Sequence, residues 1–145
     1  MSMYGKILLA IDLSEESDQL IEKTRAIADR NTAELHLIHV IEPLSFAYGG
    51  DVPMDLTTIQ DQLDEHARSK LEQYAAKLEY PIAGMHIVSG HTETEIHRIA
   101  EELDISLIIV GSHGRHGLAL LLGSTANSVL HGATCDVLAV RVKES

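Results

Sequence analysis

The stretch that decides the fold runs from residue 107 to residue 128 and reads Leu107-Ile-Ile-Val110-Gly111-Ser-His-Gly-Arg-His-Gly-Leu-Ala-Leu-Leu-Leu-Gly123-Ser-Thr-Ala-Asn-Ser128. Its opening run of branched apolar residues predicts a buried strand. The glycines that follow predict a turn in which the backbone can approach a ligand closely. After Gly123 the apolar residues recur at helical spacing. Because a helix N-terminus carries unpaired N–H groups and a partial positive charge, the stretch predicts a site for an anion such as phosphate.

The charge distribution supports an anion site in this stretch. The chain has 22 acidic residues among 145 and a formal net charge of −11, yet no Asp or Glu falls between Asp104 and Asp136. Even spreading would place about five there. The segment holds one arginine and three histidines instead. A neutral-to-basic loop suits a negatively charged ligand at short range, although a buried strand, a tight turn and a buried helix would also lack carboxylates.

Length and composition indicate one globular domain, residues 1–145, large enough to bury a core. We expect no secretory signal and no membrane span, because the apolar runs are too short. The single cysteine, Cys135, excludes an internal disulfide and fits a reducing cytoplasm. The acidic balance argues against nucleic-acid binding, which depends on neutralising phosphates with Lys and Arg.

Apolar runs and amphipathic segments alternate along the chain, which predicts a doubly wound α/β fold with a five-stranded parallel sheet and helices on both faces. We expect strands at residues 6–12, 34–41, 85–88, 106–110 and 136–142. We expect helices after Ser14, over about 57–79, from Thr92 and over 124–131. Capping boxes are predicted at Thr57 with Gln60 and at Thr92 with Glu95, and the side chain of Ser14 can cap the first helix.

The inward faces of these helices follow from their spacing. The first helix is expected to bury Leu20, Thr24, Ile27 and Ala28. The longest is expected to bury Leu56, Ile59, Leu63, Ala67, Leu71, Tyr74 and Leu78. The third is expected to bury Ile96, Ile99, Ala100 and Leu103.

Two strand ends carry groups suited to ligand binding. Asp12 closes the first strand and Gly111 opens the loop after the fourth. Ligands of doubly wound sheets lie at the carboxyl ends of strands where the strand order reverses, so these two residues would face one crevice if their strands are neighbours. Asp12 could then accept hydrogen bonds from a ribose, or it could cap nearby backbone N–H groups.

A long loop and a pair of histidines are further candidates for function. The sequence from 42 to 55 predicts a long irregular loop that could cover a ligand. His36 and His39 lie three apart in the second strand and face opposite sides, so they cannot chelate one metal. We predict no metal site in the protein and no catalytic residue.

Three motifs together resemble the universal stress protein family over the whole chain. They are Ile-Leu-Leu-Ala-Ile-Asp-Leu-Ser-Glu-Glu-Ser at residues 7–17, the glycine loop at 111–124, and Cys-Asp-Val-Leu-Ala-Val-Arg at 135–141. The resemblance implies a small cytoplasmic, dimeric stress-response protein of the adenine nucleotide alpha hydrolase-like fold, with strand order 3-2-1-4-5. One branch of the family binds ATP.

The resemblance also implies roles for individual residues. It suggests Asp12 at the ribose, the backbone of Val40 at the adenine, and the glycine loop around the phosphates of ATP, ADP or AMP. Magnesium would come with the nucleotide. The candidate cofactor-binding residues are Ala10, Ile11, Asp12, Val40, Val110, Gly111, His113, Gly114, Arg115, Gly123, Ser124 and Thr125.

The sequence departs from the ATP-binding pattern in one spacing. The family loop usually has nine residues between its second glycine and the Gly-Ser pair, whereas this chain has eight, at 115–122. In addition, Asp-Leu-Ser-Glu-Glu-Ser at 12–17 and Tyr-Pro-Ile at 80–82 look more like the branch named for universal stress protein A, whose members can lack the loop and do not bind ATP. A dimeric adaptor without nucleotide therefore stays open beside the nucleotide-binding reading.

A slow ATPase is the third alternative, against which stands the absence of a Walker lysine after the glycine loop. The last strand, 137–142, is apolar, and if it forms the edge of the sheet it would invite pairing with a second copy in a homodimer.

Overall fold

The computed structural model describes residues 3–42, 56–113 and 124–143. The predicted loop at 43–55 and the glycine loop from Gly114 to Gly123 lie outside them. The strands are β1 (Lys6–Ala10), β2 (Glu34–Ile41), β3 (Ile82–Ser89), β4 (Leu107–His113) and β5 (Asp136–Val142). The helices are the 3₁₀ helix η1 (Glu15–Leu20) and the α-helices α1 (Ile21–Asn31), α3 (Leu56–Leu78), α4 (Thr92–Glu102) and α5 (Ser124–Gly132).

The five strands form a parallel sheet in the order β3-β2-β1-β4-β5. The chain builds outward from β1 to β3 on one side and then returns to add β4 and β5 on the other. The order therefore reverses between β1 and β4. Both the doubly wound sheet and the strand order 3-2-1-4-5 are confirmed, and β5 is an edge strand, as predicted.

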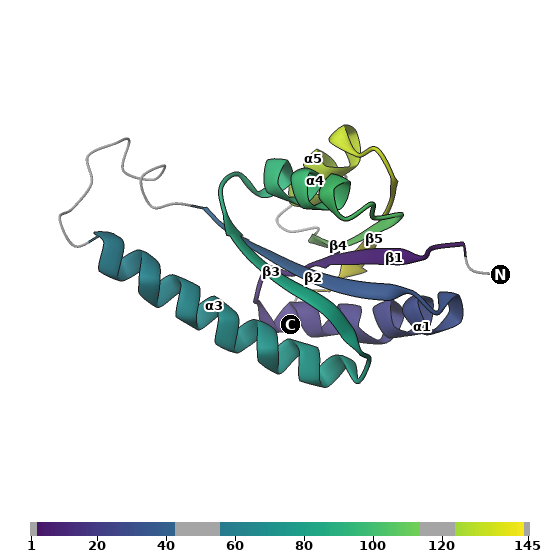
Figure 1. Ribbon diagram of the computed structural model, residues 1–145, viewed down its shortest axis with the longest axis horizontal. Helices are drawn as coiled ribbons and strands as arrows, with labels where there is room; N and C mark the ends of the chain where they lie inside the picture. Colours follow the sequence, from purple (N-terminus) through teal and green to yellow (C-terminus); the bar gives the residue numbers. More distant parts are fainter. Residues whose placement is uncertain (1–2, 43–55, 114–123, 144–145) are drawn as a thin grey trace.

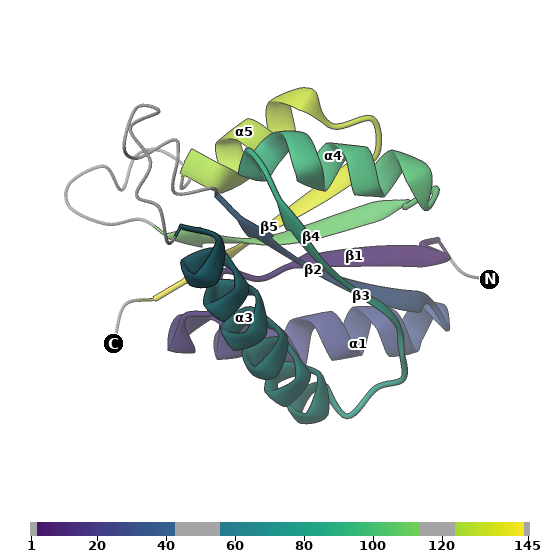
Figure 2. The ribbon, with the colours of Figure 1, turned by 60° about the vertical axis from the view of Figure 1, so that its left-hand side comes forward.

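Helices cover both faces of the sheet, with α1 and α3 on one side and α4 and α5 on the other (Figure 1 and Figure 2). This arrangement follows from the central strand, in which Ile7, Leu8 and Leu9 are all fully buried. Their alternating side chains join two separate cores, because successive side chains of a strand point to opposite faces. Ile7 and Leu9 belong to the core under α1 and α3, and Leu8 belongs to the core under α4 and α5.

The predicted inward faces are confirmed at most of the described positions, but Ile59 and Leu63 of α3, which were expected to be buried, are only half-buried. Buried positions on the helices are Leu20, Thr24, Ala28, Ala67, Leu71, Tyr74, Leu78, Ile96, Ile99 and Ala100. Ile27 and Leu103 are partly buried and pack against these cores. The side chains of Leu56 and Thr57 lie outside the described part of the chain.

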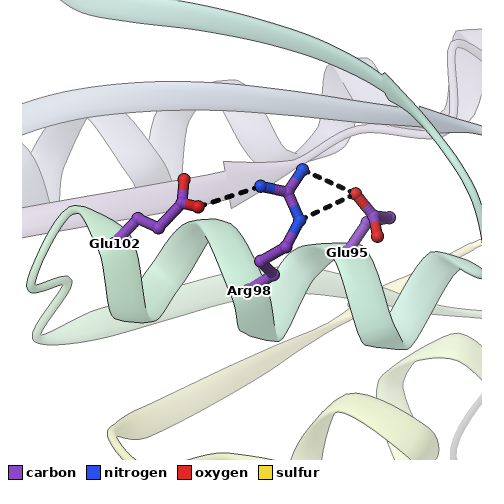
Figure 3. Close-up of polar contacts among 3 residues, drawn as sticks. All are labelled: Glu95, Arg98 and Glu102. Carbon is purple, nitrogen blue, oxygen red and sulfur yellow. Dashed lines mark hydrogen bonds and ion pairs between the residues drawn. The ribbon is translucent and has the colours of Figure 1, made fainter.

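The capping box predicted at Thr92 is wrong. The N-cap is His91, one residue earlier, and its side chain makes no capping hydrogen bond. The Thr92 hydroxyl instead donates to Glu42 Oε1 at 3.0 Å. The Glu95 carboxylate turns along the helix to accept two hydrogen bonds from Arg98, whose guanidinium also reaches Glu102 (Figure 3). An ion pair one turn away therefore competes successfully for the group that a capping box needs.

The first helix also begins differently from the expectation. Ser14 is the N-cap by position, but its side chain makes no capping hydrogen bond. It binds the carboxylate of Asp12, and six residues of 3₁₀ helix precede the α-helix.

Strand bounds agree at β2 and β5 and differ elsewhere. β3 is longer than the predicted 85–88, because residues around Gly84 pair with β2 despite interrupting the apolar pattern. β1 ends at Ala10, two residues before the predicted end, although the Ile11 amide still donates to Ile38. β4 continues past Val110 to residue 113 alongside β5.

Across the described ranges, none of the helices combines the length and the apolar character that crossing a bilayer requires.

Candidate functional site

A cavity of about 150 Å³ opens at the carboxyl ends of β1, β2 and β4. It spans the position between β1 and β4 at which the strand order reverses, which is where doubly wound sheets place their ligands. Its lining residues are Ala10, Ile11, Asp12, Ser17, Leu20, Ile38, His39, Val40, Thr92, Ile96, Val110, Gly111 and Val142. Asp12 and Gly111, which the sequence placed at one crevice, do share it.

Among the described residues, Asp12 is the one carboxylate of this lining, and its orientation is fixed by the turn that follows β1. Its Oδ1 accepts hydrogen bonds from the Ser14 amide at 3.0 Å, the Ser14 hydroxyl at 2.7 Å and the Ser17 hydroxyl at 2.5 Å. The alternative in which Asp12 caps a nearby backbone N–H group is therefore also observed, because the Ser14 N–H is one of the three donors. The side chain is nevertheless exposed and lines the cavity. The turn therefore presents a carboxylate in a set position.

Ser17 is itself held by the long helix α3. The Tyr74 hydroxyl donates to the Ser17 carbonyl at 2.6 Å, and both residues are buried. Burial, together with the nearby Asp18 and Asp12 charges, raises the pKa of Tyr74 well above its usual value, so its hydroxyl stays protonated and remains a donor. The position of Asp12 is therefore supported by a second element of the fold.

The helix η1 that carries Ser17 is also joined to the end of β5. The Gln19 side-chain amide donates to the Lys143 carbonyl at 2.6 Å, and its oxygen accepts from the Lys143 amide at 2.9 Å. Val142, the residue before, lines the cavity. The wall beside Asp12 is thus built jointly from η1 and β5.

Leu13, directly after Asp12, has a left-handed backbone with φ 67°. This conformation costs a residue with a Cβ roughly 1–3 kcal/mol. The surrounding hydrogen bonds maintain it, and it turns the chain sharply from β1 into η1. Backbone strain of this kind collects at ligand-binding turns.

The opposite wall is formed by the end of β2 and the start of α4. Val40 and His39 line the cavity, and the His39 Nδ1 lies 2.7 Å from the Ile11 carbonyl. Because a carbonyl can only accept, Nδ1 carries the proton of a neutral His39. Thr92 completes this wall, and its hydroxyl is held by Glu42.

The described part of the structure brings some of the predicted site residues together and leaves others outside it. Ala10, Ile11, Asp12, Val40, Val110 and Gly111 all line the cavity. His113 ends β4 while Ser124 and Thr125 open α5, and their side chains lie outside the description. Gly114, Arg115 and Gly123 fall in the segment that the structure does not describe.

Sequence reasoning missed Ser17, His39 and Thr92 as cavity residues. Ser17 had a readable signal, since serines two and five residues after Asp12 are well placed to hydrogen-bond a carboxylate at a strand end. His39 and Thr92 come from segments far apart in the sequence, and only the sheet brings them together. Over the ranges 3–42, 56–113 and 124–143, no cluster of three or more potential metal ligands occurs.

The fold and this cavity place the protein in the class of doubly wound α/β proteins with a cavity at the switch point between β1 and β4. The family model of the universal stress proteins matches residues 3–141, and the chain belongs to that family.

Relatives match along nearly their full length. The chain is 44% identical over 149 residues to universal stress protein A homolog 2 of Coxiella burnetii, with 100% of both chains covered. The solved structure of MJ0577 from Methanocaldococcus jannaschii superposes with a TM-score of 0.79 at 28% identity, covering 99% of each chain. A universal stress protein solved in complex with cAMP superposes with a TM-score of 0.68 at 22% identity, covering 98% of this chain and 100% of that one, and this likeness shows the shared fold.

Proposed function

We propose that this protein binds ATP or another adenine nucleotide in the cavity between β1 and β4 and acts as a regulatory homodimer in the cytoplasmic stress response. The observation that carries the proposal is that one cavity at the switch point is lined by all six candidate residues whose surroundings the structure describes. Membership of the universal stress protein family supports the same class of ligand.

The volume and charge of the cavity support a division of the nucleotide between two regions. At about 150 Å³ it is smaller than the roughly 300–1,000 Å³ of pockets that enclose whole drug-sized ligands. We assign the nucleoside to this cavity, with the Asp12 carboxylate accepting from ribose hydroxyls and the Val40 backbone beside the adenine. A polyphosphate would be repelled by Asp12. We therefore assign the phosphates to the acid-free glycine loop of the sequence, with Gly114, Arg115, Gly123, Ser124 and Thr125 as the candidate residues and magnesium bound through the phosphates.

The edge strand supports the dimer part of the proposal. β5 is the outer strand beside β4, and Val137, Leu138 and Ala139 on it are only partly buried. An edge with unpaired backbone groups and half-covered apolar side chains favours pairing with a second copy through the same surface. Sedimentation over a range of concentrations tests this, and a monomer at every concentration would contradict it.

The experiment for nucleotide binding compares two neighbouring carboxylates. Wild type, Asp12→Asn and Asp18→Asn are titrated calorimetrically with adenosine and with magnesium ATP. Asp18 is the matched control, because it lies on η1, pairs with Lys77 and does not line the cavity. Asparagine keeps an acceptor for the Ser14 and Ser17 donors. Losing a hydrogen bond to a charged group costs about 1.5–3 kcal/mol, so adenosine affinity should fall about 10- to 100-fold in Asp12→Asn.

Magnesium ATP should lose less affinity than adenosine in Asp12→Asn, because the substitution also removes a repulsion from the phosphates. Asp18→Asn should bind both like wild type. Protein that is purified without added nucleotide, releases no adenine on denaturation and gives no heat with ATP would refute the proposal.

That result would favour the second candidate, a dimeric adaptor without nucleotide, which the eight-residue spacing before Gly123 supports. Bound ADP with steady phosphate release that is lost in Gly123→Val would instead identify a slow ATPase.

A further inference from the structure

A second group of polar side chains lies away from the cavity, on the outer strands β2 and β3. His36 is in register with Gly84 and Ile38 is in register with His86. Because side chains of a strand alternate, His36, Gly84 and His86 share one face of the sheet. Their positions do not overlap the cavity lining. The group is therefore separate from the proposed nucleotide site.

The two imidazoles present nitrogens to each other at a distance that suits a shared metal ion. His36 Nδ1 and His86 Nε2 lie 3.3 Å apart, and the ring centroids are 5.4 Å apart at an angle of 32°. Two nitrogens that each bind tetrahedral zinc at about 2.0–2.1 Å are separated by about 3.3–3.4 Å. The pair already has this separation.

Gly84 keeps one side of the pair open. A Cβ at this position would lie 3.0 Å from His36 Nδ1 and 3.1 Å from His86 Nε2, and so would be in contact with both nitrogens at once. With no side chain there, the space next to both nitrogens is bounded by glycine backbone. Gly84 is partly exposed, whereas an alanine methyl group at this position would press against both nitrogens.

The protonation of the pair also suits a metal. The two rings are joined by a hydrogen bond between ring nitrogens, and neutral imidazole is the form that binds a metal. One neutral ring donates to the other in the hydrogen-bonded pair. Binding would require that proton to move to the outer nitrogen of the same ring, so no net proton is released.

The charges around the pair are mixed. Glu34 and Lys6 act in opposite directions on His36, and Glu102 acts on His86. Glu102 is held by Arg98 at 3.0 Å (Figure 3). Within the described residues no third histidine, cysteine or carboxylate completes a cluster. The remaining coordination positions would go to water.

We propose that His36 and His86, beside Gly84, form a two-histidine site for a divalent transition metal of the zinc and copper class. Imidazole suits these metals, whereas magnesium and calcium prefer oxygen ligands. With two protein ligands the metal is exchangeable, and its affinity is set by the histidine pair.

The test uses tag-free, chelator-treated protein without nucleotide. Zinc chloride is titrated calorimetrically, and copper(II) is followed by electron paramagnetic resonance, which reports the nitrogens bound to the metal. His36→Gln and His86→Gln should each weaken zinc binding at the strongest site about tenfold or more. His66→Gln, which removes an exposed histidine of α3, should bind like wild type. Copper on the wild type should show two coupled imidazole nitrogens.

Gly84→Ala adds a variant that retains both histidines, and it should lose binding because its methyl group occupies the open side. Circular dichroism verifies that each variant is folded. The proposal would be overturned if either histidine variant or Gly84→Ala bound zinc with wild-type affinity. It would also be overturned if His66→Gln lost as much affinity as the histidine variants of the pair. A wild type that takes up no zinc would show that the two rings are only a hydrogen-bonded pair.

Discussion

Thr24, on the buried face of α1, gives a prediction whose size can be worked from the structure. The residue is fully buried, and its Oγ1 has no hydrogen-bond partner among the described residues. An unpaired buried hydroxyl costs about 1–3 kcal/mol. Thr24→Val replaces the hydroxyl by a methyl group of similar size, and threonine and valine have similar helix propensities. We therefore expect the free energy of unfolding to rise by about 1 kcal/mol and Tm by about 3–5 °C.

Urea denaturation followed by circular dichroism measures this change, and two control variants locate its cause. Thr94→Val makes the same substitution at an exposed position of α4 and should stay within about 0.5 kcal/mol of wild type. Thr24→Ser keeps the hydroxyl and removes the methyl group, so it should be destabilised by about 1 kcal/mol. If Thr24→Val were no more stable than wild type, the hydroxyl would have a partner and the reasoning would fail.

Two further predictions concern stability. Gly132→Ala should destabilise by about 1–3 kcal/mol, because its Cβ would clash with the His97 ring where α5 packs on α4. Gly5→Ala, with nothing within 4 Å of its Cβ, should change little in the same urea assay. Stability should also fall as pH drops below about 6.5, because burial lowers the pKa of His36 and His86 and the unfolded chain then binds protons first. The contribution of the two histidines to stability is therefore fully present above that pH. In the double variant His36→Gln/His86→Gln, the free energy of unfolding should depend less steeply on pH just below that value than in wild type.

The sequence was sufficient for the parts of the fold that depend on local patterns. The fully apolar run of β1 and the spacing of Ile96, Ile99 and Ala100 on α4 predicted buried faces that the structure confirms. Asp12 and Gly111 were correctly placed at one crevice, because the carboxyl ends of parallel strands meet at one edge.

The parts that the sequence did not predict depend on competition or on long-range register. The Glu95 carboxylate could accept a hydrogen bond from the backbone at the start of the helix or pair with Arg98. Spacing alone did not show that the ion pair forms. From the sequence, His36 could be compared as a metal ligand only with His39 of its own strand. Its actual neighbour is His86 of another strand, and that contact depends on the register of β2 with β3, which shifts between Leu35 and His36.

The two hydrogen bonds between Gln19 and Lys143 have a consequence for regulation. Since Gln19 and Ser17 share η1, a force that draws the end of β5 outward also pulls on the donor that orients Asp12. Association along that strand and occupancy of the cavity would then be energetically coupled. By thermodynamic reciprocity, each would change the affinity of the other by the same factor.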